Sequence, residues 1–255
     1  MILEGRDLSF AYHSLPVLEN VDIRIAPGVT AIIGPNAAGK STLMKCLAGL
    51  LVPQGQVRLD GGDARRLSTR SLTDPVSYLP QNLSTQAALT VFETVLLGRF
   101  HKLRWRVSAD DVRLVEGLLE EFDLVDLSGR NITELSGGQL QMVSIAQALA
   151  RDPCVLLLDE PTSNLDLQHQ FEICSIIAGL TGSRGMSTAM ALHDLNVAAR
   201  FADIVYVLKD GTIQCSGPPA DVLTEAMISE VYRVASRVTI DAAGIPLITP
   251  LGLAR

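Results

Sequence analysis

Residues 34–42 have the types and spacing of a phosphate-binding loop. They read Gly-Pro-Asn-Ala-Ala-Gly-Lys-Ser-Thr and fit the pattern G-x-x-x-x-G-K-[ST]. In this pattern a glycine-bearing turn directs consecutive backbone N–H groups at phosphate oxygens, the lysine adds a positive charge, and the serine supplies a ligand for magnesium. The loop therefore predicts a site for bound phosphate groups.

The residues on either side predict the elements that hold this loop. Residues 29–33 form a short apolar, β-branched run typical of a buried strand, and residues 41–50 have the composition of a helix. Such a helix directs the positive end of its dipole at the bound anion. A tight strand-to-helix turn that merely needs glycine would explain the loop alone, but not the other polar segments along the chain.

A second helix start suited to an anion lies at residues 135–139, which read Leu-Ser-Gly-Gly-Gln. Residues 140–150 that follow are good helix formers, and Ser136 is suited to cap their N-terminus. The two glycines would let an anion approach the backbone N–H groups closely. The alternative is a plain capped helix that begins with a glycine turn.

Two carboxylates follow the most apolar run of the chain. Residues 154–158 predict a fully buried parallel strand, and Asp159 and Glu160 stand at its ligand-facing end. Burial of acids there is costly unless a cation or hydrogen bonds compensate. Asp159 is placed to hold magnesium, directly or through water, and Glu160 to orient or deprotonate a water that attacks a γ-phosphate. The alternative is a pair of caps for the next helix.

Three further side chains stand where strands are predicted to end. Gln81 follows a short strand at residues 76–80, and His193 follows a buried strand at residues 188–192. At the carboxyl edge of a parallel sheet both could touch a ligand, His193 as a donor to a γ-phosphate. Tyr12 ends the first strand and offers a flat face for a base. Each has a plain alternative as a loop, structural or packing residue.

Composition excludes several classes of protein. The chain has 255 residues, a net charge of −7 and a pI near 5.1, so it does not resemble a general nucleic-acid or anionic-membrane binder. It has no apolar run near the roughly 20 residues that span a bilayer, and its start lacks a secretory signal. We expect a cytosolic chain that does not cross a membrane. Its four cysteines and four histidines lack metal-type spacing, so we expect no structural metal.

The order of patterns predicts an α/β protein of one domain with embellishments. Two antiparallel strands, at residues 2–12 and 21–25 with a turn at 13–16 between them, precede the loop, and the stretch 89–149 is helical in character. Residues from about 217 onward form an appendage that we expect to pack on the core. The stretch 99–106 is the most basic, with interleaved aromatics. It is either a solvated loop or a docking surface for another protein.

With these segments in this order, the chain resembles the ATP-binding subunit of an ABC transporter. The resemblance covers nearly the whole chain. It implies a P-loop NTPase (RecA-like) core, from residues 1–82 and 152–215, that carries an antiparallel β subdomain. It also implies an inserted α-helical subdomain at 83–151, with the Leu-Ser-Gly-Gly-Gln motif, and an appendage at 216–255.

The resemblance further implies a role for each site residue. Glu160, His193 and Gln81 would be catalytic, and Ser41, Gln81 and Asp159 would bind Mg²⁺. The residues implied to hold ATP in the same chain are Tyr12, Gly34, Pro35, Asn36, Ala37, Ala38, Gly39, Lys40, Ser41 and Thr42. Those implied to contact the ATP of a second chain are Ser136, Gly137, Gly138, Gln139 and Asp166.

The resemblance also implies partners, because the residues that contact one ATP are divided between two chains. Two copies would pair head to tail, so that residues 136–139 of one chain close over ATP held by Lys40 of the other. The dimer would work with an integral membrane permease and, indirectly, a substrate-binding protein. It would lie peripherally on the inner face of the cell membrane and would not bind nucleic acid.

Three segments indicate a narrower group within the family. Residues 89–99, 166–170 and 193–200 are similar to importers of iron chelates, haem and cobalamin, and we favour an iron-siderophore importer. Two departures from the family concern surface charge, because Leu140 and Gln147 stand where basic residues are frequent. The third departure is Ala37, which stands where the family often has glycine. Because alanine is also small, we expect this change to leave nucleotide binding intact. A soluble ABC ATPase acting on nucleic acid or ribosomes, and a chain with a purely regulatory site, are the rival interpretations.

Overall fold

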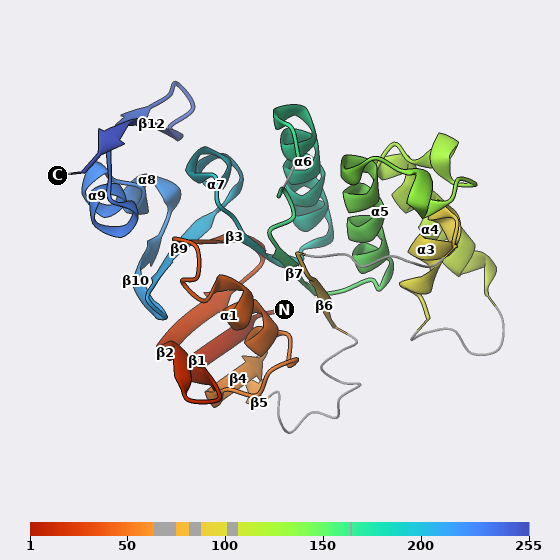
Figure 1. Cartoon of the computed structure of the whole chain (residues 1–255). Coiled ribbons are helices and arrows are strands. Elements are labelled where there is room, and N and C mark those ends of the chain that lie inside the picture. The colour runs from red at the N-terminus through yellow and green to blue at the C-terminus, as the bar shows by residue number, and fades with distance from the viewer. Residues whose placement is uncertain (64–74, 82–87, 101–106, 164, 255) are drawn as a thin grey trace.

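The computed structural model describes residues 1–63, 75–81, 88–100, 107–163 and 165–254 (Figure 1). Residues 101–106, most of the basic stretch predicted above, and Asn164 lie outside the described residues. At the start of that stretch, Arg99 Nε pairs with Asp111 Oδ1 at 2.8 Å, within the helical part of the molecule. No helix among the described residues is long and apolar enough to cross a membrane.

A six-stranded sheet runs through the centre of the molecule. Its neighbouring strands are parallel except for one antiparallel pair at the edge, β9 with β10. The two central strands β7 and β8 are fully buried, as expected for a parallel sheet that is covered on both faces. The order is β10 (Thr212–Gly217), β9 (Ile204–Lys209), β3 (Gly28–Ile33), β8 (Ser187–Ala191), β7 (Val155–Asp159) and β6 (Val76–Leu79).

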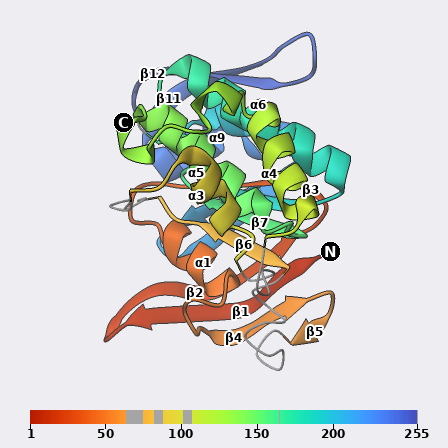
Figure 2. The same ribbon diagram turned by 90° about the vertical axis from the view of Figure 1, so that its right-hand side faces the viewer.

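A second, antiparallel sheet is formed by the N-terminal part of the chain. Its order is β2 (Leu15–Ile25), β1 (Leu3–Tyr12), β4 (Gln54–Leu59) and β5 (Gly62–Asp63). In Figure 2 this sheet forms a layer beneath helix α1 (Lys40–Leu47). The fold is therefore the predicted α/β core with an antiparallel β layer.

The predicted start of the second strand was wrong. The turn holds only His13 and Ser14, and the strand begins at Leu15, which pairs with Tyr12. His13 takes a positive φ of 57°, which reverses the chain within two residues. Pro16 is tolerated in the strand because β2 lies at the edge of its sheet, where a missing N–H need not break a ladder.

The predicted helix at residues 41–50 was also too long. Helix α1 ends at Leu47, and Gly49 adopts a left-handed φ of 72° just beyond it. A glycine in this conformation is the commonest way to end a helix.

A helical layer lies beside the edge strand β6. It contains α3 (Val91–Leu97), α4 (Ala109–Glu121) and α5 (Gly137–Ala150), with short 3₁₀ turns at Val125–Leu127 and Ile132–Glu134. Capping boxes begin all three helices, with Thr90, Ser108 and Ser136 as the N-caps. These pairs fix where each helix starts, because the cap side chain and the third helical residue satisfy each other's backbone N–H.

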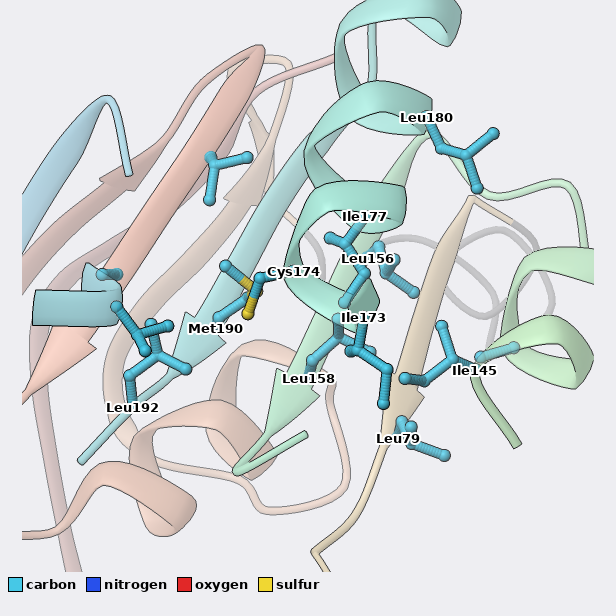
Figure 3. Packing of buried hydrophobic residues seen from close by; sticks show 14 of the residues in the cluster. Leu79, Ile145, Leu156, Leu158, Ile173, Cys174, Ile177, Leu180, Met190 and Leu192 are labelled. Carbon is cyan, nitrogen blue, oxygen red and sulfur yellow. The ribbon is translucent and has the colours of Figure 1, made fainter. Parts of the chain in front are cut away.

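Alternate residues of the central strands supply two separate cores. Leu156 and Leu158 of β7 pack against α6 (Leu167–Arg184), among residues that include Ile173 and Ile177 (Figure 3). The intervening residues of β7 face the other core, which α1 and the antiparallel sheet cover. Each strand is therefore clamped from both sides, which fixes where its carboxyl end lies.

The C-terminal appendage packs on the helix that follows β8. It consists of α8 (Pro219–Val222), α9 (Glu225–Tyr232), β11 (Val234–Ile240) and β12 (Pro246–Leu253), and that helix is α7 (Leu195–Phe201). The Asn196 side chain holds β12 through both backbone groups of Ile248, accepting from N at 2.8 Å and donating to O at 3.1 Å. The two strands of the appendage pair with each other as an antiparallel hairpin over their whole length.

The phosphate loop, residues 34–42, depends on left-handed backbone at three positions. Gly34 has a φ of 155°, and a Cβ there would lie 1.9 Å from the carbonyl oxygen of Leu208. Gly39 has a φ of 103° at the N-cap of α1, and Ala37 has a φ of 63°. The expectation that a small residue suffices at position 37 is incomplete, since a left-handed φ strains any residue with a Cβ.

We therefore predict that Ala37→Gly increases the free energy of unfolding of the nucleotide-free chain by about 0.5–1 kcal/mol. The left-handed strain of about 1–2 kcal/mol is removed, and the greater chain entropy of glycine offsets roughly half of it. Urea denaturation would measure the change. Ala38→Gly is the matched control, because Ala38 is buried and its φ is not positive, so this change should be destabilising. A loss of stability in both variants would contradict the prediction.

Candidate active site

The phosphate loop opens into a pocket of about 950 Å³ at the carboxyl ends of the parallel strands. We call it the phosphate-loop pocket. Three sets of residues line it. One set comes from the first part of β2, one from the loop and α1, and one from the segments after β6, β7 and β8 and the β9–β10 turn. They are Leu15, Pro16, Val17, Glu19, Asn36, Ala37, Ala38, Gly39, Lys40, Ser41, Thr42, Gln81, Glu160, His193, Asp210 and Gly211.

Lys40 is the buried cation of this pocket. Its side chain is held against the loop, where Nζ donates to the carbonyl oxygens of Gly34 at 2.8 Å and Pro35 at 3.1 Å. Only 5% of the residue is exposed, and burial lowers the pKa of the ammonium group while Glu160 and Asp159 act in the opposite direction. A desolvated ammonium without a nearby anion is costly, so this position favours binding of phosphate.

Asp159 is the buried anion of the site. It ends β7 and receives two hydrogen bonds, from Ser41 Oγ to Oδ1 at 3.0 Å and from the Tyr78 hydroxyl to Oδ2 at 3.1 Å. Burial raises the pKa of Asp159, and the two hydrogen bonds oppose that shift. The sequence did not reveal Tyr78. A tyrosine in a buried strand needs a partner for its hydroxyl, but the pattern does not say which residue on β7 supplies it.

The oxygen atoms of Asp159 and its neighbour Ser41 are suitable ligands for a magnesium ion. Carboxylate and hydroxyl oxygens are the hard ligands that Mg²⁺ prefers, and the 3.0 Å bond between Ser41 and Asp159 places one of each together. Gln81, the third expected ligand, has its amide turned toward Glu160 instead. Ser41 and Asp159 therefore fit the ion, and the Gln81 amide must turn to join them.

Glu160 stands at the meeting point of three strand ends. Gln81 Nε2, beyond β6, donates to Oε2, and His193 Nε2, beyond β8, bonds Oε1. Its backbone has a left-handed φ of 52°, and its N–H donates to Ala191 O at 3.2 Å. The carboxylate thus faces the pocket between two polar side chains, in a position to accept a proton from a water there.

Tyr12 does not line the phosphate-loop pocket. It is 42% exposed, and its ring packs edge-on against Phe10 with ring centroids 5.0 Å apart. The hairpin reaches the pocket through Leu15, Pro16 and Val17, which the sequence interpretation missed because it placed a turn there. No regular alternation marked these residues, because the burial pattern of β2 alternates only from Val21 onward.

The residues expected to act on a second chain also lie outside this pocket. Ser136 caps α5, with its Oγ accepting from Gln139 N at 3.3 Å and its N–H donating to Gln139 Oε1 at 3.1 Å. Asp166 caps α6, and its Oδ1 accepts from His169 N at 2.9 Å. Neither helix start is among the residues that line the phosphate-loop pocket of the same chain.

Known proteins are similar to this chain in sequence and in fold. The family model described as ABC transporter matches residues 18–163. An uncharacterized ABC transporter ATP-binding protein of Methanocaldococcus jannaschii is 40% identical, over 99% of both chains. The ferric enterobactin transport ATP-binding protein FepC of Escherichia coli is 36% identical, over 98% of this chain and 94% of FepC. The hemin import ATP-binding protein HmuV of Rhodopseudomonas palustris is 37% identical, over 97% of both.

Solved structures agree with these relatives. An inward-facing ABC transporter assigned to the metal-chelate type matches with a TM-score of 0.83 at 26% identity, over 98% of this chain and 97% of that one. The dimeric ATP-binding cassette MJ0796 bound to ADP and Pi matches with a TM-score of 0.76 at 28% identity, over 86% of this chain and 99% of that one. With the phosphate loop, the buried acids and these matches together, the chain belongs to the ATP-binding proteins of the ABC transporter family, which are ATPases.

Proposed function

We propose that this chain is the ATP-hydrolysing subunit of an ABC importer that takes up a metal chelate, in particular an iron-siderophore complex. One observation carries the hydrolytic part. Glu160 is held between Gln81 and His193 beside a phosphate loop, whereas the second anion-binding helix start, at Ser136, lies outside that pocket. In the proposed arrangement a second chain supplies that helix start to the site.

Each residue of the pocket has a separate role in ATP hydrolysis. Lys40 and the N–H groups of the phosphate loop bind the phosphates, and Ser41 and Asp159 would hold Mg²⁺. The ion, when bound, neutralises charge on the phosphate oxygens. Glu160 accepts a proton from the attacking water, and His193 donates a hydrogen bond to the γ-phosphate. Gln81, which donates to Glu160, would turn its amide to join the ligands of the ion.

A second copy completes the site. Residues 136–139 and Asp166 of one chain contact ATP held in the phosphate-loop pocket of the other. Tyr12 does not line that pocket in the nucleotide-free chain, and its exposed ring contacts the base only once ATP is bound. Each dimer then has two composite sites: ATP binding closes it and hydrolysis reopens it. The dimeric state of the cassette MJ0796 with ADP and Pi supports this arrangement.

The dimer works on a membrane permease, and the permease and a capture protein select the cargo. FepC, named for ferric enterobactin transport, supports an iron-siderophore, and the hemin import protein HmuV makes haem the second candidate. In this arrangement the chain is peripheral to the membrane.

We predict that Glu160→Gln keeps ATP binding but lowers turnover by roughly 10²–10⁴-fold, because the amide cannot accept the proton of the attacking water. Closed dimers should accumulate with ATP, measured by size-exclusion chromatography with light scattering. Glu120→Gln, the same change at an exposed position of α4, is the control and should retain turnover. Full turnover by Glu160→Gln would remove Glu160 from the catalytic role.

We also predict that the ATPase rate per chain rises with protein concentration and then saturates, because each site needs two chains. Steady-state phosphate release across the monomer-to-dimer range would measure this, with Lys40→Ala as the inactive background. A rate per chain that stays flat over that range would count against composite sites.

Purification of the chain from detergent-solubilised native membranes should bring down a multi-span permease. Uptake assays with that complex are expected to favour a ferric siderophore over hemin and cobalamin, with Glu160→Gln as the inactive control. Preference for hemin or cobalamin would correct the cargo. Recovery of ribosomes or nucleic acid instead of a permease would overturn the transport assignment.

A further inference from the structure

The first turn of α6 organises the segment that carries Asp166. Asp166 Oδ1 accepts from the backbone N–H of His169 at 2.9 Å and lies 2.7 Å from its ring Nδ1. Gln170 Nε2 donates to Leu165 O at 3.0 Å and is 3.5 Å from Thr162 O. The backbone before the helix is thus tied to the side chains of its first turn, and the Asp166 carboxylate contacts both the backbone and the ring of His169.

The other side of the His169 ring faces the helix start at Ser136. A Cβ on Gly138 would lie 3.1 Å from His169 Cδ2 and 3.4 Å from its Cγ, whereas a Cβ on Gly137 would meet nothing within 4 Å. Gly138 is buried and Gly137 is exposed. The two glycines therefore have different surroundings: Gly137 is exposed with open space at its Cβ position, and Gly138 makes room for the imidazole.

The hydrogen bonds fix the orientation of that ring. Hydrogen bonds from the His169 backbone and ring lower the pKa of Asp166, so its carboxylate stays ionised and only accepts. His169 Nδ1 is then the donor, and the ring carbons lie against Gly138. The side chain is 34% exposed and does not line the phosphate-loop pocket of its own chain.

We propose that His169 is a positioning residue that joins Asp166 to residues 136–139, so that both segments reach the ATP of the partner chain as one unit. This inference rests on the proposed head-to-tail dimer. Helix α5 belongs to the helical layer and α6 packs on the six-stranded sheet, side by side in Figure 1. A ring placed between their two helix starts holds the spacing that a composite site requires.

The two halves of this role can be removed separately. His169→Asn keeps a donor for Asp166 but leaves space above Gly138, and His169→Phe fills that space but loses the bond to Asp166. His169→Ala removes both. All three should leave ATP binding by the isolated chain unchanged, measured with a fluorescent ATP analogue at a protein concentration below dimerisation, because His169 is outside the pocket.

Dimer closure is the readout that separates positioning from a merely structural role. In a Glu160→Gln background, we expect His169→Ala to raise the ATP concentration needed for half-maximal dimerisation by about 10-fold, with Asn and Phe in between. Gln168→Ala is the matched control. It is the preceding, exposed residue and bonds Glu172 Oε1 at 2.8 Å instead, so it should change nothing.

A double-mutant cycle tests the contact itself. Gly138→Ala should impair dimerisation more when His169 is present than when His169 is Ala, because the added methyl then has room. Independent effects of the two changes, or unchanged dimerisation of the His169→Ala chain, would overturn this inference alone. If Glu160→Gln itself does not dimerise with ATP, the proposed function fails and this inference fails with it.

Discussion

The rest of the structure depends on two opposite charges that are buried close to the same strand ends. Asp159 is 3% exposed and Lys40 is 5% exposed, and neither could remain charged without partners. Carbonyl oxygens of the phosphate loop satisfy the ammonium, while Ser41 and Tyr78 satisfy the carboxylate. Because these partners come from the loop, α1 and β6, the site exists only when the loop, both cores and the sheet are assembled.

The parallel sheet converts this constraint into a catalytic arrangement. Gln81, Glu160 and His193 follow β6, β7 and β8, which are neighbours in the sheet although they are far apart in the chain. Alternate residues of β7 are held in two different cores, so the strand cannot slip by one residue without exchanging its buried faces. The same packing that stabilises the fold therefore sets the distance between Glu160 and its two neighbours. Under the proposed function, a second chain then supplies what this rigid half-site lacks.

Local patterns were sufficient to predict much of this protein. The phosphate loop, the Ser136 cap and the buried strands depend on residue types within a few positions of one another, and each was found where the sequence placed it. The errors were also local: the second strand starts at Leu15 because an edge strand accepts Pro16, and α1 ends at Leu47, shortly before Gly49. Resemblance to a known family then added roles that spacing alone could not assign.

The sequence by itself determined which side chains stand at strand ends and helix starts. The hydrophobic period, the helix caps and the residues that break helices and strands all depend on neighbouring positions in the chain. Only the tertiary structure decided which of them meet. The bond from Tyr78 to Asp159, the approach of Leu15 to the pocket in place of Tyr12, and the contact of His169 with Gly138 each join segments that lie far apart in the chain or on different layers. Such contacts depend on how sheets and helices pack in three dimensions, and no pattern of neighbouring residues records that.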